Sequence, residues 1–269
     1  MPGRPLIEVC VSSVADAVAA VDAGADRLEL CCALEVGGLT PSVALLESVL
    51  AQMSVPVVAM IRPRPGGFFY QPDEFRTALS DAKWALRLGA SGVVFGFLTA
   101  EGGIDTARCR EMIAIAGDRD TVFHRAFDYV RDPLAAADQL VDLGVTRLLT
   151  SGQRSSSLEG ADLIRRVADR TRGKLQVMPG GGIRPENVLE ILEKTGCDQV
   201  HVGAAIAQHD HSLDGNPELA LVATQYLTGN AYRRSDSNMI EHLARAISSP
   251  ENSKRDPAHL ANLPSRRPT

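Results

Sequence analysis

The chain has no long hydrophobic segment and no excess of positive charge. None of its apolar runs reaches the ~18 residues that a transmembrane helix requires. The 28 Lys and Arg residues stand against 33 Asp and Glu residues, which gives a net charge of −5 and a sequence pI of about 5.7. Proteins that bind DNA or RNA usually carry a basic surface. We therefore expect neither a membrane nor a nucleic-acid partner.

Cysteine and metal-binding motifs are also scarce. The 269 residues include five cysteines, an odd number, and none of them forms a Cys-x-x-Cys pair. The opening segment MPGRP leads into a strand-like run without the hydrophobic region of a signal peptide. Reduced thiols in the cytoplasm are therefore expected rather than a disulfide framework. There is no His-Glu-x-x-His motif, and His124 and His201 lie far apart in sequence, which disfavours a zinc or iron enzyme.

The chain does contain short apolar, β-branched runs that alternate with longer segments of helical periodicity. These runs cover residues 6–11, 27–31, 56–61, 92–97, 121–124, 147–150, 175–178 and 199–202. Such alternation predicts parallel strands joined by helical crossovers. Eight such strands close a barrel, so the fold class predicted is α/β, a single (β/α)8 TIM barrel. A doubly wound open sheet is the alternative, but no Gly-x-Gly-x-x-Gly follows the first run, so no nucleotide cofactor is expected.

A recurring glycine supports this count of strands. It precedes the second, fourth, sixth and eighth runs, at Gly24, Gly89, Gly144 and Gly196. Each of these residues can take the left-handed conformation that ends a helix, before a short polar turn and the next strand. The pattern predicts a barrel that repeats every two β/α units.

The composition changes toward the C-terminus. Residues 1–228 are assigned to the barrel, including a last helix at 216–227. Residues 229–269 are rich in Arg, Ser, Asn and Pro and form a polar extension with one predicted helix around 239–247. The segment 248–269 is expected to be disordered.

Several charged side chains are predicted to point into the barrel. Strand side chains alternate between the faces of a sheet, so the apolar residues at 7, 9 and 11 leave Glu8 and Cys10 inward. The same rule places six further side chains inside the barrel: Arg27, Glu29, Cys31, Arg62, His124 and His201. Arg64 follows just beyond, at the mouth of the barrel. Buried charge is costly unless it is paired. The cluster therefore predicts either mutual neutralisation or a polar ligand.

Loops after the later strands add groups that bind anions. Glycine-rich segments follow the seventh and eighth runs, where barrels often hold phosphate through backbone N–H groups: Gly180, Gly181, Gly182 and Gly203. The loop after the sixth run contributes Ser151 and Gly152, and the loop after the fifth contributes Arg125 and Asp128. Together they predict an arginine-lined pocket at the carboxyl ends of the strands.

Seven short segments of the chain, taken in order, resemble motifs of the CutC family. They are EVC (8–10), DRLELC (26–31), GGLTPS (37–42), IRPR (61–64), FHRAFD (123–128), LTSGQ (149–153) and PGGG (179–182). The resemblance runs from about residue 6 to 205 and implies a TIM barrel, a homo-oligomer (dimer or tetramer), and a copper homeostasis role with Cu(I) binding. The chain departs from the family in two places. The segment PGGF (65–68) lacks the usual aspartate, and Gln199 stands where an acidic residue is common.

The function that the resemblance favours is non-enzymatic binding and handling of Cu(I). Soft thiolates select Cu(I). Cys10 and Cys31 lie at the inward ends of neighbouring strands, so both sulfur atoms could reach one ion. This predicts a copper site of two thiols at the mouth of the barrel.

The alternative is an orphan isomerase, lyase or hydrolase that acts on a small phosphorylated or anionic sugar-like substrate. Glu8, Glu29 and His124 would then act as general acid and base, with Asp128 beside them. The arginines, glycine loops and His201 would bind the substrate. A scaffold without chemistry is a third possibility. The segment His209-Asp210-His211 resembles a pair of metal ligands, but in the loop after the last strand it is expected to be solvated.

Overall fold

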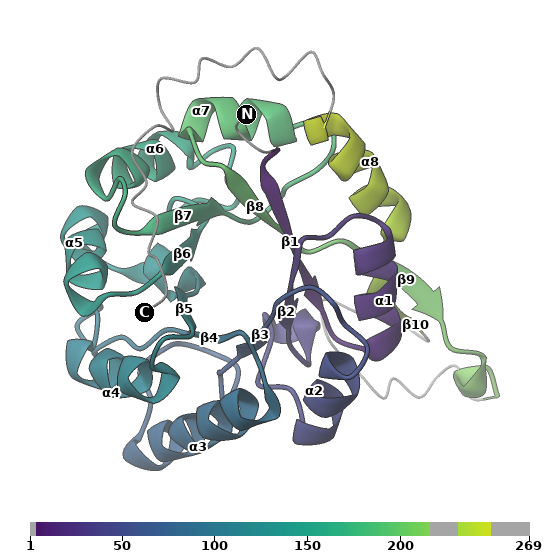
Figure 1. Cartoon of the computed structure of the whole chain (residues 1–269), viewed down its shortest axis with the longest axis horizontal. Coiled ribbons are helices and arrows are strands. Elements are labelled where there is room, and N and C mark those ends of the chain that lie inside the picture. The colour runs from purple at the N-terminus through teal and green to yellow at the C-terminus, as the bar shows by residue number, and fades with distance from the viewer. Residues whose placement is uncertain (1–3, 216–230, 249–269) are drawn as a thin grey trace.

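The computed structural model describes residues 4–215 and 231–248, and in these residues eight parallel strands form one sheet (Figure 1). Their order is β7-β6-β5-β4-β3-β2-β1-β8. The strands are β1 (Leu6–Val11), β2 (Arg27–Leu30), β3 (Val57–Met60), β4 (Gly92–Phe95), β5 (Asp120–Phe123), β6 (Arg147–Thr150), β7 (Gln176–Pro179) and β8 (Gln199–Val202). The predicted TIM barrel is confirmed, with strand ends that differ from the predicted ones by at most two residues.

Within the described residues, eight α-helices surround the sheet (Figure 1). They are α1 (Val14–Asp22), α2 (Val43–Leu50), α3 (Pro72–Leu88), α4 (Thr106–Ala116), α5 (Pro133–Leu143), α6 (Ala161–Arg170), α7 (Val188–Thr195) and α8 (Ser237–Ser248). Short 3-10 helices lie in three loops: η1 (Leu34–Val36), η2 (Arg125–Tyr129) and η3 (His211–Leu213). None of the helices in the described ranges is long and apolar enough to cross a membrane.

The four recurring glycines end helices, as the sequence predicts. Gly24, Gly89, Gly144 and Gly196 all have positive φ angles, between 69° and 104°. An L-residue with a side chain rarely adopts this conformation. The glycine recurrence therefore marks real helix ends and sets the start of every second strand.

The barrel closes at a single point between its last two strands. Gly180, just after β7, forms an isolated parallel bridge with His201 of β8. A Cβ atom on Gly180 would lie 2.4 Å from Leu149 Cδ1 and 3.2 Å from His201 Cβ. A larger residue would force the Leu149 side chain to move, so glycine at 180 allows β7 to lie next to the strand that carries His201.

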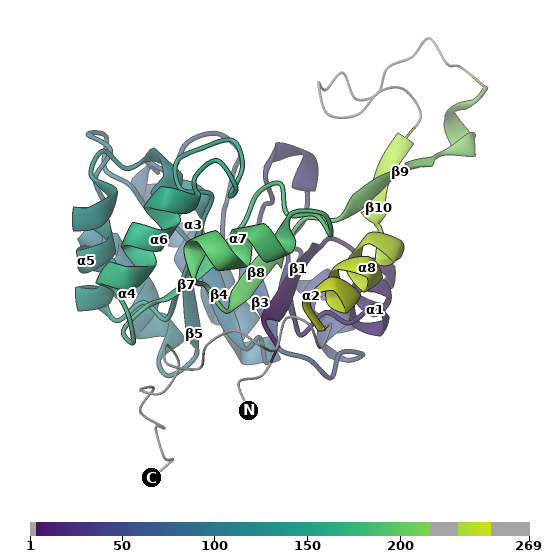
Figure 2. The same ribbon diagram turned by 90° about the horizontal axis from the view of Figure 1, so that it is seen from above.

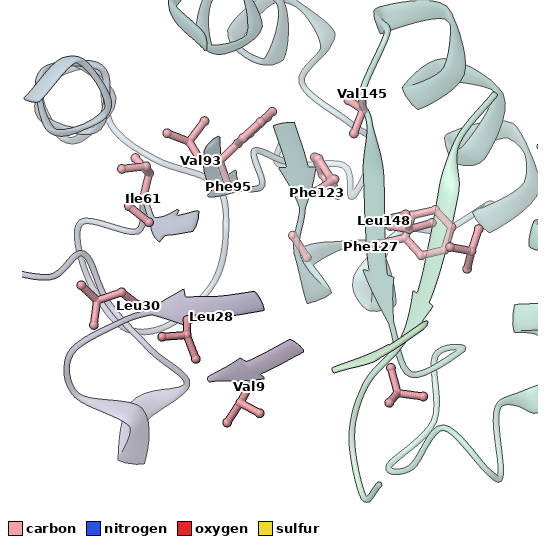
Figure 3. Packing of buried hydrophobic residues seen from close by; sticks show 14 of the residues in the cluster. Val9, Leu28, Leu30, Ile61, Val93, Phe95, Phe123, Phe127, Val145 and Leu148 are labelled. Carbon is pink, nitrogen blue, oxygen red and sulfur yellow. The ribbon is translucent and has the colours of Figure 1, made fainter. Parts of the chain in front are cut away.

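Two apolar layers lie on the two faces of the sheet. The larger one fills the space between strands and helices and includes Val9, Leu28 and Leu148 (Figure 3). The smaller one lies inside the barrel and consists of Cys10, Cys31, Val58, Met60, Val94, Val122, Leu149 and Met178. Odd and even residues of each strand thus separate as strand alternation requires, and Cys10 and Cys31 lie on the inner face as predicted.

A two-stranded arm projects from the barrel between β8 and α8 (Figure 2). Strands β9 (Ala205–His209) and β10 (Ala231–Ser235) pair antiparallel. Neither strand is predicted from the sequence, which places residues 209–211 in a loop after the last strand of the barrel, so the arm is a new feature of the structure.

Helix α8 belongs to the ring of helices although it lies in the segment assigned to the extension. The helix predicted around 239–247 is confirmed as α8, which lies between α7 and α1 (Figure 1). Its side chains Ile240, Leu243 and Ile247 are buried in the outer apolar layer. The predicted helix at 216–227 and the expected disorder beyond 248 fall outside the described residues.

Candidate functional site

A buried ion pair lies inside the barrel where β1, β2 and β8 run side by side. The register places Glu8 beside both Arg27 and His201. Glu8 Oε2 accepts a hydrogen bond from Arg27 Nε at 2.5 Å, and Glu8 Oε1 lies 2.8 Å from His201 Nδ1. Burial alone would raise the pKa of Glu8, but the hydrogen bond from His201 and the charges of His201, Arg27 and Arg147 lower that pKa to about 2. Mutual neutralisation, one of the two predicted outcomes, is therefore present here.

Two more polar side chains complete this inner network, and the sequence analysis names neither as a site residue. Arg27 Nη2 donates to Gln199 Oε1 at 3.0 Å. Arg147 is buried at the start of β6 and bonds to Asp120 and Gln176. Strand alternation could have identified Arg147, because Leu148 next to it faces the helices.

The two predicted thiols meet at the inner face. The Sγ atoms of Cys10 and Cys31 lie 3.7 Å apart, and Cys31 Sγ donates to Glu29 Oε1 at 3.3 Å. Cys31 is fully buried, whereas Cys10 remains 9% exposed. Both thiols are free. Cys10 is thus the less deeply buried member of the pair.

These groups change one another's proton affinity. The hydrogen bond with Cys31 lowers the pKa of Cys10 to about 6 despite burial, and His201 contributes further. The same hydrogen bond and burial raise the pKa of Cys31 well above its usual value. Burial raises the pKa of Glu29 to about 8, with contributions from the charges of Cys10 and Glu8. Burial alone would lower the pKa of His201, but Glu29, Cys10 and Glu8 raise it well above its usual value. Of the two thiols, Cys10 is therefore the one whose thiolate form is favoured, and the neighbouring groups favour the protonated form of His201.

Glu29 is the one carboxylate of this cluster with an unused oxygen. Its Oε2 atom is buried and has no hydrogen-bond partner. Within the described residues, Glu29 belongs to two sets whose ligand atoms all lie within 4.8 Å of one another, Cys10–Glu29–Cys31 and Glu8–Glu29–His201. Buried polar atoms are normally satisfied. The unpartnered Oε2 therefore remains available as a ligand atom or as a hydrogen-bond acceptor.

Arg62 holds the loop that covers the thiols. Its guanidinium donates to the carbonyl oxygens of Val36, Gly38 and Gly66 at 2.8–3.0 Å. A Cβ atom on Gly38 would lie 3.1 Å from Cys31 Sγ, so this loop packs directly against the thiol. Arg62 thus positions backbone over Cys31 within the folded chain, and anion binding by its guanidinium stays a prediction.

Aromatic side chains surround His124 at the mouth of the barrel. Phe68, which the sequence analysis does not single out, lies with its ring 4.9 Å from the His124 ring and 5.4 Å from the Arg62 guanidinium. His124 Nδ1 accepts a hydrogen bond from the Ala126 N–H, while Nε2 is buried without a partner. Burial and then the charge of Arg62 lower the pKa of His124 to about 3. His124 is therefore a neutral imidazole at the start of η2.

Asp128 organises the loop after β6. Its carboxylate accepts hydrogen bonds from Thr150 Oγ1, from the N–H and Oγ of Ser151 and from the Gln153 N–H, at 2.5–3.2 Å. Arg125 Nε donates to the same carboxylate at 2.8 Å, and Arg125 Nη2 donates to Ser151 Oγ at 2.8 Å. With this many donors, Asp128 is an anchor for the loop. A catalytic role for it, as predicted, stays untested.

The predicted anion-binding groups are brought together in part. A Cβ atom on Gly181 would lie 3.4 Å from Ser151 Cβ and 3.5 Å from Arg125 Nη1. These three residues therefore lie together on one side of the mouth, in the loops that follow β5, β6 and β7. Gly152 and Gly182 lie in the adjoining loops with positive φ angles, and Gly203 is exposed after β8. Arg64 is apart from this group: it pairs with Glu74 and donates to backbone carbonyls of its own loop.

The sequence matches a known family over most of its length. The model of the CutC family matches residues 5–206, which include every strand of the barrel and both thiols. The chain belongs to the CutC family. A CutC family protein of Treponema denticola is 47% identical over 231 residues, covering 86% of this chain and 92% of the relative. The human copper homeostasis protein cutC homolog is 44% identical over 219 residues, covering 81% of this chain and 80% of the relative.

Solved structures agree with this assignment. The CutC protein of Streptococcus agalactiae has a TM-score of 0.70 at 33% identity, and the match covers 73% of this chain and 97% of that one. Phosphoribosylanthranilate isomerase of Thermotoga maritima has a TM-score of 0.53 at 14% identity, covering 90% and 98%. The second similarity is one of fold alone, that of a TIM barrel. The protein is thus a CutC-family homologue of copper homeostasis proteins.

Proposed function

We propose that this CutC-family protein binds Cu(I) as its cargo between the thiols of Cys10 and Cys31, in the reducing cytoplasm. The observation that carries the proposal is the approach of the two sulfur atoms to 3.7 Å on the inner face of the barrel. Two metal–sulfur bonds of about 2.3 Å, the length found for zinc thiolates, reach sulfur atoms up to about 4.6 Å apart. The donor set therefore fits a soft metal ion, and thiolate ligands favour Cu(I) over harder ions.

The surroundings of the thiols support the same proposal. Cys31 is enclosed by the loop that Arg62 holds, while Cys10 is the partly exposed member of the pair. An ion would therefore enter and leave past Cys10. The interior layer around the sulfurs also contains Met60 and Met178, whose thioethers are compatible with a soft cation.

A competition titration tests the proposal. Reduced protein is titrated with Cu(I) against a chromophoric Cu(I) chelator, and the wild type is compared with Cys10→Ser/Cys31→Ser. The matched control is Cys32→Ser, since Cys32 is next in sequence and its Sγ donates to the Thr40 carbonyl. We expect one tightly bound Cu(I) in the wild type and the control, and its loss in the double variant. Equal binding in all three proteins would contradict the proposal, provided that thermal melting shows the variants to be folded.

A second candidate function is acid–base chemistry on a small anionic substrate. It is favoured by the unpartnered Oε2 of Glu29 inside the barrel, together with Arg125, Ser151 and Gly181 at the mouth. The arginine and the backbone N–H groups of the glycine loop would hold the anion. Glu29 would then exchange a proton with the substrate.

Phosphorylated sugars separate the two functions. Ribose 5-phosphate and glucose 6-phosphate are incubated with the wild type and with Arg125→Gln, and binding and conversion are followed by ligand-observed NMR. An enzyme of this kind binds or converts one of these probes, and the variant loses most of that effect. Cu(I) affinity should be unchanged in Arg125→Gln, because Arg125 bonds to Asp128 and Ser151 and to neither thiol.

A further inference from the structure

The arm formed by β9 and β10 carries a second group of potential metal ligands, far along the chain from the thiols. Figure 2 shows the arm extending away from the barrel, with η3 at the outer end of its described part. The base of the arm is fixed, because the Ser235 N–H donates to the buried carboxylate of Asp16 at 2.8 Å. The outer end is exposed.

Three side chains converge at this outer end. Asp214 Oδ1 lies 2.7 Å from His209 Nε2, and Asp214 Oδ2 lies 3.0 Å from His211 Nδ1. The two imidazole rings have centroids 4.6 Å apart and are inclined at 72°. One nitrogen from each histidine and one carboxylate oxygen therefore lie within 4.8 Å of one another.

Local structure explains this convergence. His209 is the last residue of β9, and Asp210 begins the 3-10 turn η3 by accepting hydrogen bonds from the N–H and Oγ of Ser212. A 3-10 helix has three residues per turn, so side chains three positions apart lie on the same face. His211 and Asp214 have this spacing, and their shared face is the one toward which His209 points.

We infer that His209, His211 and Asp214 form a binding site for a divalent transition-metal ion such as Zn²⁺, distinct from the thiol pair. Two imidazole nitrogens and one carboxylate oxygen suit borderline ions and not the soft Cu(I) ion. The three protein ligands leave coordination positions open for water. Side-chain contacts as exposed as these, with 85% of the His211 side chain accessible, contribute little to stability, so the folded chain does not depend on them.

The test measures how many Zn²⁺ ions the full-length, untagged protein takes up in competition with a colorimetric Zn²⁺ chelator. The wild type is compared with His209→Ala/His211→Ala and with His242→Ala, which removes an exposed histidine on α8. Any Zn²⁺ held by the thiols is common to all three proteins and cancels in the comparison.

We expect the double variant to bind one Zn²⁺ fewer than the wild type, while His242→Ala binds the same number. The single variant His211→Ala should weaken this one site by at least about tenfold, the lower end of the loss seen when even an outer-shell partner is removed. The inference is overturned if the wild type and the double variant take up the same number of ions with the same affinity. Failure of Cu(I) binding at Cys10 and Cys31 would leave this result unaffected.

Discussion

The substitution Arg27→Met should show how much the free energy of unfolding depends on the buried pair of Glu8 and Arg27. Glu8 is 0% exposed, and Arg27 is its close guanidinium partner inside the barrel. Breaking a buried ion pair by removing one partner typically costs about 3–5 kcal/mol. Despite burial, the pKa of Glu8 is lowered to about 2 by His201 first and then by Arg27 and Arg147, so only part of this lowering is lost with Arg27. His201 still bonds to Glu8 in Arg27→Met, so we expect a loss of about 3 kcal/mol at pH 7.

The loss of stability in Arg27→Met should also become smaller as pH falls. A carboxylate whose pKa is lower in the folded protein stabilises it above the unfolded pKa, and this stability disappears as pH falls toward the folded pKa. For Glu8 that window runs from about 4.5 down to about 2. The difference between the wild type and Arg27→Met should therefore narrow between pH 7 and pH 3, by less than the ~2 kcal/mol that the whole Glu8 shift would give, because His201 still lowers the Glu8 pKa in the variant. The double variant Glu8→Gln/Arg27→Met should lose less than the sum of the single variants, because neither charge is then left alone.

Urea unfolding is the assay, followed by circular dichroism and by the fluorescence of Trp84, the single tryptophan. Coincident transitions for the two probes justify reading free energies from the curves. A loss below about 1 kcal/mol in Arg27→Met, or a loss that does not change between pH 7 and pH 3, would refute the assignment of Glu8 and Arg27 as a stabilising buried pair.

Three further changes test separate parts of the structure, each by urea unfolding. The pKa of His124 is about 3 when folded and near 6.5 when unfolded, so between pH 7 and pH 5 the wild type should lose about 2 kcal/mol more stability than His124→Asn does; equal pH dependence in both would show that His124 is not buried and neutral. Gly180→Ala should cost about 1–3 kcal/mol by overpacking against Leu149. The exposed control Gly203→Ala should change stability by less than about 0.5 kcal/mol, and equal effects at the two glycines would contradict the tight closure. Asp128→Asn should cost about 1–3 kcal/mol, because an amide N–H₂ would face backbone donors; unchanged stability would argue against its role as a loop anchor.

Strand alternation made the inner face of the barrel predictable. A period of two fixes which residues share a face, so Glu8, Cys10 and Glu29 could be placed inside the barrel from the apolar residues between them. The same rule applies to Arg147, which was overlooked although Leu148 beside it faces the helices. The periodicity of the sequence therefore predicts the fold and the side chains that point into the barrel.

The partners of loop residues could not be predicted in this way. Arg62 donates to carbonyls of two loops and Asp128 gathers donors from the loop after β6, and these contacts depend on loop conformations that no periodicity specifies. The arm was missed because β10 has the sequence AYRRS, without the apolar alternation of a half-buried strand. The dimer or tetramer that the family resemblance implies stays a prediction.

The central claim is that Cu(I) binds between the sulfur atoms of Cys10 and Cys31, and X-ray absorption at the copper edge tests it most directly. Protein loaded with one equivalent of Cu(I) should show sulfur scatterers in the first shell. Cys31→Ser should lose one sulfur from that shell or lose the copper altogether, because its sulfur is one of the pair 3.7 Å apart. A first shell of nitrogen and oxygen only, or a spectrum that is the same in the wild type and Cys31→Ser, would contradict the account.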